Sequence, residues 1–225
     1  MESSKSILLI SVVSYISYFL VSWGYKLKHF HNLSAVIDKH KSILILSLKY
    51  FAGILLLGLP GLFLSGDYQF LLFNKPNFQN ENVLTIWIVL LFSVLLISSI
   101  SAKKNILQNG IKTNSLPFFK CIFYLFIRVL FLLAYEFYFR GVLLFALIPL
   151  LGLVSAIAVN TFLYSFQHIF DAKKELLGSV PFGIIVCVLS FYTQSIWPAF
   201  ILHASLAGVY EGSFLFNYTS KSSRS

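Results

Sequence analysis

Four polar side chains in the carboxyl-terminal half of the chain have types that could activate water for general-base hydrolysis at a carbonyl carbon. Glu136 and Arg140 are four residues apart in one apolar run, so a helix places them on one face, where they can form an ion pair. His168 and His203 lie in two later apolar runs. Charged side chains at membrane depth are costly, so such groups face the interior of a helical bundle and find partners there.

This set of groups has a specific chemical interpretation. A carboxylate and an imidazole on either side of a water molecule can remove its proton and direct it at a carbonyl carbon. A second imidazole can stabilise the oxyanion, and an arginine keeps a nearby glutamate ionised and fixed. On this hypothesis Glu136 is the base, His168 its partner on the water and His203 the oxyanion donor. No cofactor is then required. Alternatively, Glu136, His168 and His203 could bind a divalent metal such as zinc, with one coordination position open.

Each residue also has a structural interpretation. Glu136 and Arg140 could simply neutralise each other within one helix, and His168 could be a hydrogen-bonded packing residue. Arg128 is expected to be structural, reaching toward the inner interface or a backbone carbonyl. Polar groups on three different apolar runs favour a functional cluster over three separate structural roles. Five aromatic residues are expected only in the belts at the membrane surfaces: Tyr15, Tyr18, Trp23, Trp87 and Trp197.

The elements that must position these residues are membrane-spanning helices. The chain is 58% hydrophobic and 11% charged, less than half of the roughly 25% charge of a soluble domain. We therefore predict an all-α, polytopic transmembrane helical bundle of about seven spans, unless 177–193 is re-entrant. The fourth run is about 28 residues long, so it must tilt or begin in the interface. The expected spans are 6–23, 43–64, 83–101, 121–148, 152–169, 177–193 and 196–215.

The net charge of +9 lies in short loops between apolar runs, which is typical of membrane topology and not of nucleic-acid binding. The loop charges predict a multi-pass protein of the cell (plasma) membrane with its amino terminus outside and its carboxyl terminus in the cytoplasm. Cys121 and Cys187 lie in apolar runs and are expected to be unpaired. The side with most cations carries Lys26, Lys28, Lys39, Lys41, Lys103, Lys104, Lys112, Lys173, Lys174, Lys221 and Arg224, and the other side carries Lys5 and Lys75.

Three motifs in residues 120–215 resemble those of a known family, the CPBP/Abi family of intramembrane endopeptidases, which includes the type II CaaX prenyl proteases. Tyr135-Glu136-Phe137-Tyr138-Phe139-Arg140-Gly141 resembles its Glu-Glu-x-x-x-Arg motif. Tyr164-Ser165-Phe166-Gln167-His168 resembles Phe-x-x-x-His, and His203-Ala204-Ser205-Leu206-Ala207 resembles His-x-x-x-Asn or Asp. The resemblance implies a protease that acts on a membrane-associated peptide or protein, with Glu136, Arg140, His168 and His203 as site residues.

The chain departs from the family pattern at two positions. Tyr135 stands where the family has its first glutamate, and Ala207 stands where it has asparagine or aspartate. Glu211 is then a second candidate for a base, and Tyr210, more squarely below His203, could replace the missing amide donor. These departures favour an alternative function: a proteolytically inactive member that binds a partner, in bacteriocin immunity or membrane-protein assembly. A transporter or proton path is the third hypothesis, although the two halves show no paired broken helices.

The motifs also set the expected division of the chain. Residues 1–117 form transmembrane helices without a recognised motif, 118–215 form the protease-like region, and 216–225 form a cytoplasmic tail. The expected partners are the lipid bilayer and a peptide or protein substrate within it, and no nucleic acid.

Overall fold

A computed structural model describes residues 2–30, 32–38, 42–64, 68–109 and 117–219, and this part of the chain is helical with no strand. Seven of its helices are long and apolar enough to cross a membrane. The prediction of an all-α bundle with about seven spans is therefore confirmed. The spans are Ser6–Leu27, Ile43–Phe63, Glu81–Leu107, Phe118–Leu151, Leu153–Phe170, Lys173–Thr193 and Trp197–Phe216.

The helices follow one another with short connections between them. The segments η1 and η3 are π-helical, and η4 is a 3₁₀ turn. The elements are α1 (Glu2–Leu27), α2 (Leu33–Asp38), α3 (Ile43–Gly53), η1 (Ile54–Gly58), α4 (Leu59–Leu64), α5 (Phe70–Phe73), α6 (Glu81–Asn109), α7 (Phe118–Glu136), η3 (Phe137–Leu143), α8 (Leu144–Leu151), α9 (Leu153–Gln167), η4 (His168–Phe170), α10 (Lys173–Thr193) and α11 (Trp197–Thr219).

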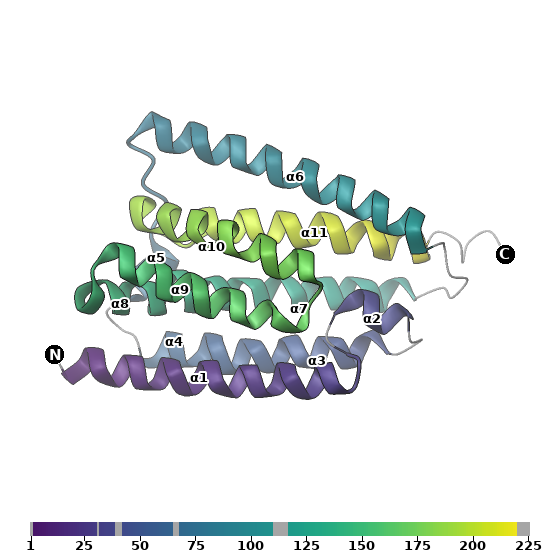
Figure 1. The fold of residues 1–225 in the computed structure, drawn as a ribbon, viewed down its shortest axis with the longest axis horizontal. Helices are drawn as coiled ribbons and strands as arrows, with labels where there is room; N and C mark the ends of the chain where they lie inside the picture. Colours follow the sequence, from purple (N-terminus) through teal and green to yellow (C-terminus); the bar gives the residue numbers. More distant parts are fainter. Residues whose placement is uncertain (1, 31, 39–41, 65–67, 110–116, 220–225) are drawn as a thin grey trace.

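The spans lie side by side along the long axis of the molecule (Figure 1). Helices α1, α3 and α4 form one side, and α6 forms the opposite side, where it packs on α11. Helix α7 lies between α3 and α11, and α9 packs against α10. The helices that carry the three sequence motifs therefore pack against one another in the middle of the bundle.

The long fourth span is one continuous helical path that contains a π-helical segment. Helix α7 ends at Glu136, η3 follows, and α8 ends before Gly152, whose φ of 75° requires glycine. π-Helical turns widen the backbone locally and occur often at functional sites. Here the segment begins directly after Glu136 and contains Arg140.

Two expectations from the sequence change. Four of the five proposed belt aromatics instead tie helices together: the side chains of Tyr15, Trp87 and Trp197 donate hydrogen bonds to carbonyls of α9, α11 and α5, and Tyr18 is buried. The belt expectation was wrong for Tyr15 and Tyr18, which are buried against neighbouring helices, because sequence position does not show which face of a helix is covered. In addition, α11 extends to Thr219, into the proposed tail, and residues 220–225 lie outside the described residues.

Both cysteines, Cys121 and Cys187, are free and buried. Of the basic residues used to orient the chain, Lys39, Lys41, Lys112, Lys221 and Arg224 lie outside the described residues.

Candidate active site

The structure brings the glutamate of the first motif and the histidine of the third into direct contact. Glu136 is the last residue of α7, and its Oε1 lies 2.5 Å from Nδ1 of His203 in α11. The Glu136 side chain is completely buried and His203 is nearly so. A carboxylate and an imidazole from two different spans therefore form one hydrogen-bonded pair inside the bundle.

Arg140 completes the polar centre from the π-helical segment. Its Nε lies 3.4 Å from the second carboxylate oxygen of Glu136, and both side chains have no exposed surface. The guanidinium also lies over the ring of Tyr164, 4.2 Å from its centroid. The predicted Glu136–Arg140 ion pair is confirmed. Because a buried carboxylate needs a compensating charge, Arg140 favours the ionised form of Glu136.

Asn160 of α9 is a member of this centre that the sequence analysis missed. Its Oδ1 accepts hydrogen bonds from NH1 of Arg140 at 3.1 Å and from the thiol of Cys187 at 3.3 Å. Its Nδ2 donates to the carbonyl oxygen of Phe139 at 2.6 Å. The signal was an amide in the middle of an apolar run, eight residues before His168, but only ionisable residues were considered at that depth.

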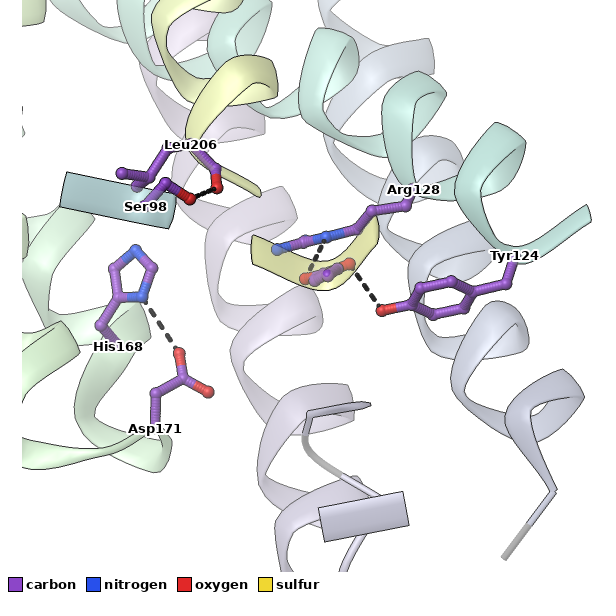
Figure 2. A network of polar contacts seen from close by, with 7 residues as sticks. Ser98, Tyr124, Arg128, His168, Asp171 and Leu206 are labelled. Carbon is purple, nitrogen blue, oxygen red and sulfur yellow. Dashed lines mark hydrogen bonds and ion pairs between the residues drawn. The ribbon is translucent and has the colours of Figure 1, made fainter. Parts of the chain in front are cut away.

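His168 lies beside the polar centre, and its hydrogen bond goes to a different carboxylate. Its Nδ1 lies 3.0 Å from Oδ2 of Asp171, in the turn before α10, as Figure 2 shows. The His168 ring contacts the ring of Tyr164 at 5.1 Å between centroids, and Tyr164 in turn contacts His203 at 6.2 Å. His168 is therefore connected to the Glu136–His203 pair through the Tyr164 ring and not through a hydrogen bond to Glu136.

The hydrogen bond to Asp171 also defines the free side of the His168 ring. The second ring nitrogen, Nε2, is buried and has no hydrogen-bond partner in the described part of the chain. Burial by itself would raise the pKa of the Asp171 carboxyl, but the hydrogen bond from His168 and the charges of Lys49 and Arg128 outweigh burial and hold that pKa below its usual value. Asp171 is therefore an ionised partner that can orient the imidazole.

Aromatic rings enclose the imidazole of His203. Tyr135, Tyr164 and Phe182 contact it edge-on, with centroid distances of 6.0, 6.2 and 5.5 Å. Tyr135 thus contributes a ring to the site at the position where the family motif has a glutamate, and its hydroxyl is buried without a partner among the described residues. Ala207, one helical turn beyond His203, offers no side-chain hydrogen-bond donor.

The two substitutes proposed near His203 lie elsewhere. Both oxygens of Glu211 are held, one by Nε of Arg128 at 3.1 Å and the other by the hydroxyl of Tyr124 at 2.8 Å (Figure 2). The hydroxyl of Tyr210 accepts a hydrogen bond from Asn105 of α6. Glu211 and Tyr210 are therefore each engaged by other side chains, about two helical turns from His203 along α11.

The same contacts correct the expectation for Arg128. Its guanidinium pairs with the Glu211 carboxylate and stacks on the ring of Tyr50, 4.5 Å from the centroid, so these contacts are with side chains of other helices. A buried partner from another helix satisfies its charge.

Buried polar atoms without a hydrogen-bond partner concentrate around this centre. Within the described ranges, all of them belong to α7, η3, α9, η4 and α10. Folded proteins keep few such atoms, and a site that takes up water or a polar substrate is one reason to keep them. They are the hydroxyls of Tyr135, Thr161, Ser165 and Ser190, Oε2 of Glu136, Nε and NH2 of Arg140, the amide of Gln167 and Nε2 of His168.

The side chains do not fit the proposed divalent-metal site. In the described part of the chain no three His, Cys, Asp or Glu side chains are placed to hold one ion. Nδ1 of His203 contacts Glu136, whereas Nδ1 of His168 contacts Asp171, which is not one of the three candidate ligands, so Glu136, His168 and His203 do not converge on one point. A structural or catalytic zinc site needs at least three converging protein ligands. No chemical step is therefore assigned to a metal.

One family model matches the chain, over residues 115–209. Its description is "Type II CAAX prenyl endopeptidase Rce1-like". The matched region contains all three motifs and the centre formed by Glu136, Arg140 and His203. Searches of curated proteins and of solved structures gave no match. The family model thus supports the resemblance seen in the motifs: residues 115–209 are similar to the CAAX prenyl endopeptidases, while the first three spans lie outside the match.

Proposed function

We propose that the protein is an intramembrane endopeptidase that cuts a peptide bond of a membrane-associated peptide or protein. The observation that carries the proposal is the 2.5 Å contact between Oε1 of Glu136 and Nδ1 of His203, inside a region that matches a family of endopeptidases. A buried carboxylate on one imidazole nitrogen fixes the tautomer and leaves the other nitrogen to accept a proton.

The contacts favour a different division of roles from the one derived from the motifs. Arg140 keeps Glu136 ionised, and Glu136 accepts a hydrogen bond from the Nδ1–H group of His203. Nε2 of His203 then removes a proton from water while the water oxygen bonds to the peptide carbonyl carbon. In the second step the C–N bond breaks, and the proton held on Nε2 passes to the leaving amine. The products are an amine and a carboxylic acid, and the acid then releases its remaining proton to water.

His168 supplies a second oriented imidazole in this mechanism. Asp171 holds its Nδ1, and the unpartnered Nε2 can bind the same water or the leaving amine through the space beside Tyr164. Arg140 and Asp171 act on the imidazoles through charge and hydrogen bonds. The side chain that binds the oxyanion is not assigned by these contacts.

The test is cleavage by the purified chain in vesicles of phosphatidylethanolamine and phosphatidylglycerol. The probes are quenched-fluorescent peptides that each carry an apolar membrane segment, and products are identified by mass spectrometry. We expect the wild type to cut some of these peptides. The cleavage rate should fall at least about 100-fold in Glu136→Gln and in His203→Ala. The rate of the wild type should be unchanged by a metal chelator. Cleavage by both variants at the wild-type rate would remove the proposed mechanism.

A proteolytically inactive, partner-binding protein is the second candidate. Two observations favour it: Tyr135 and Ala207 occupy motif positions, and both oxygens of Glu136 already have partners, His203 and Arg140. On this alternative the pair locks α7 to α11. The same assay separates the two functions, because an inactive member leaves every peptide intact at all protein concentrations. On this alternative, cleavage requires that both motif residues be restored (Tyr135→Glu with Ala207→Asn).

We also propose a plasma-membrane location with a cytoplasmic carboxyl terminus. The ends of α1 and α6 and the start of α10, which carry Lys26, Lys103 and Lys173, lie together at one end of the bundle (Figure 1). Short basic loops are retained in the cytoplasm. In intact cells, a membrane-impermeant maleimide should label Lys75→Cys and leave Lys174→Cys unlabelled. The reverse labelling would invert the topology.

A further inference from the structure

Helices α7 and α11 are joined by two ion-pairing contacts with matching spacing. Glu136 meets His203, and Arg128 meets Glu211. The separations along the two helices are equal, since 136 − 128 and 211 − 203 are both 8. As the residue number rises on one helix it falls on the other, so the two helices are antiparallel. The two contacts are therefore successive rungs between the same pair of helices, about 12 Å apart.

The residues of these rungs lie on continuous ridges. Side chains at every fourth position form a ridge on a helix, and such ridges pack into the grooves of a neighbour. On α7 the ridge is Tyr124, Arg128, Leu132 and Glu136, and on α11 it is His203, Ala207 and Glu211. Leu132 and Ala207 are both buried and take the middle position between the rungs.

The charges alternate in a way that permits one register. On α7 the charged residues are Arg128 and then Glu136. On α11, Glu211 lies opposite Arg128 and His203 lies opposite Glu136. A slide of one turn would place Glu136 against Ala207 or Ala199, and a slide of two turns would place it against Glu211. The first leaves a buried charge without a partner, and the second puts two carboxylates together; both are strongly unfavourable.

The second rung also reaches the amino-terminal part of the chain. The Arg128 guanidinium lies over the Tyr50 ring of α3 at 4.5 Å, and the Tyr124 hydroxyl donates to Glu211. Three helices therefore meet at Glu211, and α3 belongs to the spans outside the family match.

We propose that Arg128 and Glu211 are positioning residues whose ion pair sets the register of α11 on α7 and so holds the His203 imidazole on Glu136. The geometric part of this proposal is independent of the substrate, and its effect on catalysis rests on the proposed function. Neither residue touches the reacting atoms; each acts through the two helix backbones.

The test measures register directly, by disulfide formation between Leu132→Cys and Ala207→Cys. The background is Cys121→Ser with Cys187→Ser, in vesicles. The test variant adds Arg128→Met and Glu211→Met together, because removing both charges with apolar side chains of similar length spares stability, whereas a single replacement leaves a buried charge and can prevent folding. The matched control adds Ser98→Ala, which removes a hydrogen bond from α6 to the carbonyl of Leu206 on α11 without touching α7.

We expect the double methionine variant to keep the melting temperature of its background within a few degrees. Its rate of disulfide formation should fall at least about tenfold. Its kcat against the peptide probes should fall about 100-fold, since a displacement of a reacting group by about 1 Å lowers the rate by that factor. Arg128→Lys should recover part of both rates. The Ser98→Ala control should keep both.

An unchanged disulfide rate in the double variant overturns the proposal, whatever its effect on cleavage. An unchanged kcat with a lowered disulfide rate also overturns it, because register would then not matter to the site. If the disulfide rate falls but the wild type cuts no peptide, the proposed protease function fails and the register role stands. The two failures are thus distinguishable.

Discussion

The side chain of Asn160 binds two parts of the π-helical turn at once: it accepts a hydrogen bond from NH1 of Arg140 at 3.1 Å and donates one to the carbonyl of Phe139 at 2.6 Å. Asn160 comes from α9, so this amide ties the second motif-bearing helix to the segment that carries the arginine. This amide therefore orients the Arg140 guanidinium together with Glu136 and the Tyr164 ring.

Asn160→Leu should lower the stability of the protein and weaken the Glu136 centre. The change keeps the side-chain volume but leaves an arginine N–H and a backbone carbonyl buried without partners, at a cost of about 1–3 kcal/mol for each group. The measurement is the melting temperature in detergent and in vesicles. Ser190→Ala is the matched control, because the Ser190 hydroxyl is buried without a partner and its removal should leave the melting temperature unchanged or raised. Equal losses in the two variants would contradict the role of Asn160.

Tyr135 and Tyr138 are predicted to respond in opposite ways to loss of the hydroxyl group. The Tyr138 hydroxyl donates to the carbonyl of Ser11 at 2.8 Å, whereas the Tyr135 hydroxyl has no partner in the described part of the chain. Tyr138→Phe should therefore lower the free energy of unfolding by about 1 kcal/mol, and Tyr135→Phe should leave it unchanged or raise it. A drop for Tyr135→Phe as large as that for Tyr138→Phe would show that its hydroxyl is bonded in the folded protein.

The same pair of variants bears on activity. Tyr135 contacts the His203 ring, while Tyr138 points to α1. If cleavage of the peptide probes falls in Tyr135→Phe while its stability is retained, the hydroxyl acts in the site; Tyr138→Phe should cut at the wild-type rate once corrected for folded protein.

The contacts among Glu136, Arg140 and His203 could be predicted from the sequence, because they follow from helix spacing or from the free-energy cost of burying a polar side chain. The spacing of four between Glu136 and Arg140 places them on one helix face whatever the tertiary structure, and the cost of burying His203 in an apolar run requires a polar partner. The seven apolar runs fixed the helices, and hydropathy predicts these well since a backbone in lipid has to satisfy its own hydrogen bonds.

The partners of the remaining groups depend on how helices rotate about their axes, which hydropathy does not determine. His168 was expected on Glu136 and is held by Asp171, in a turn only three residues away. Glu211 was considered as a second base near His203 but pairs with Arg128, because eight residues place it about 12 Å farther along α11. Tyr15 was assigned to the surface and is an interior cross-link to the carbonyl of Leu163. The errors at Glu211 and Tyr15 concern contacts between helices, and the one at His168 concerns a local turn.

Asp171 should make the stability of the protein depend on pH. Its pKa is below the usual value in the folded state, so the ionised carboxyl stabilises the fold above the pKa of the unfolded chain, near 3.9, and that contribution is lost as the pH falls through the folded value. The melting temperature of the wild type should therefore exceed that of Asp171→Asn at pH 7, and the difference should shrink as the pH falls through the lowered pKa of the folded state. A difference that is constant with pH would show that the carboxyl charge is not involved.

Gly53→Ala should be among the most destabilising small changes in the chain. Gly53 ends α3, and a Cβ there would overlap the Phe131 ring of α7 and lie 2.8 Å from Cε2 of Tyr18. Both rings are buried and cannot move freely, so overpacking should cost about 1–3 kcal/mol. Gly178→Ala in α10 is the control: nothing lies within 4 Å of its added Cβ, and replacing a helical glycine should gain up to about 1 kcal/mol.

This glycine also explains why the spans outside the family match affect the site. Because α3 has no side chain at residue 53, it can approach α7 closely enough for Tyr50 to lie against both Phe131 and Arg128. Gly53→Ala should then slow the disulfide between Leu132→Cys and Ala207→Cys as well as lower the melting temperature, since it displaces the aromatic support of the Arg128–Glu211 rung. If the melting temperature falls and the disulfide rate is kept, α3 stabilises the bundle without controlling how α11 is positioned on α7.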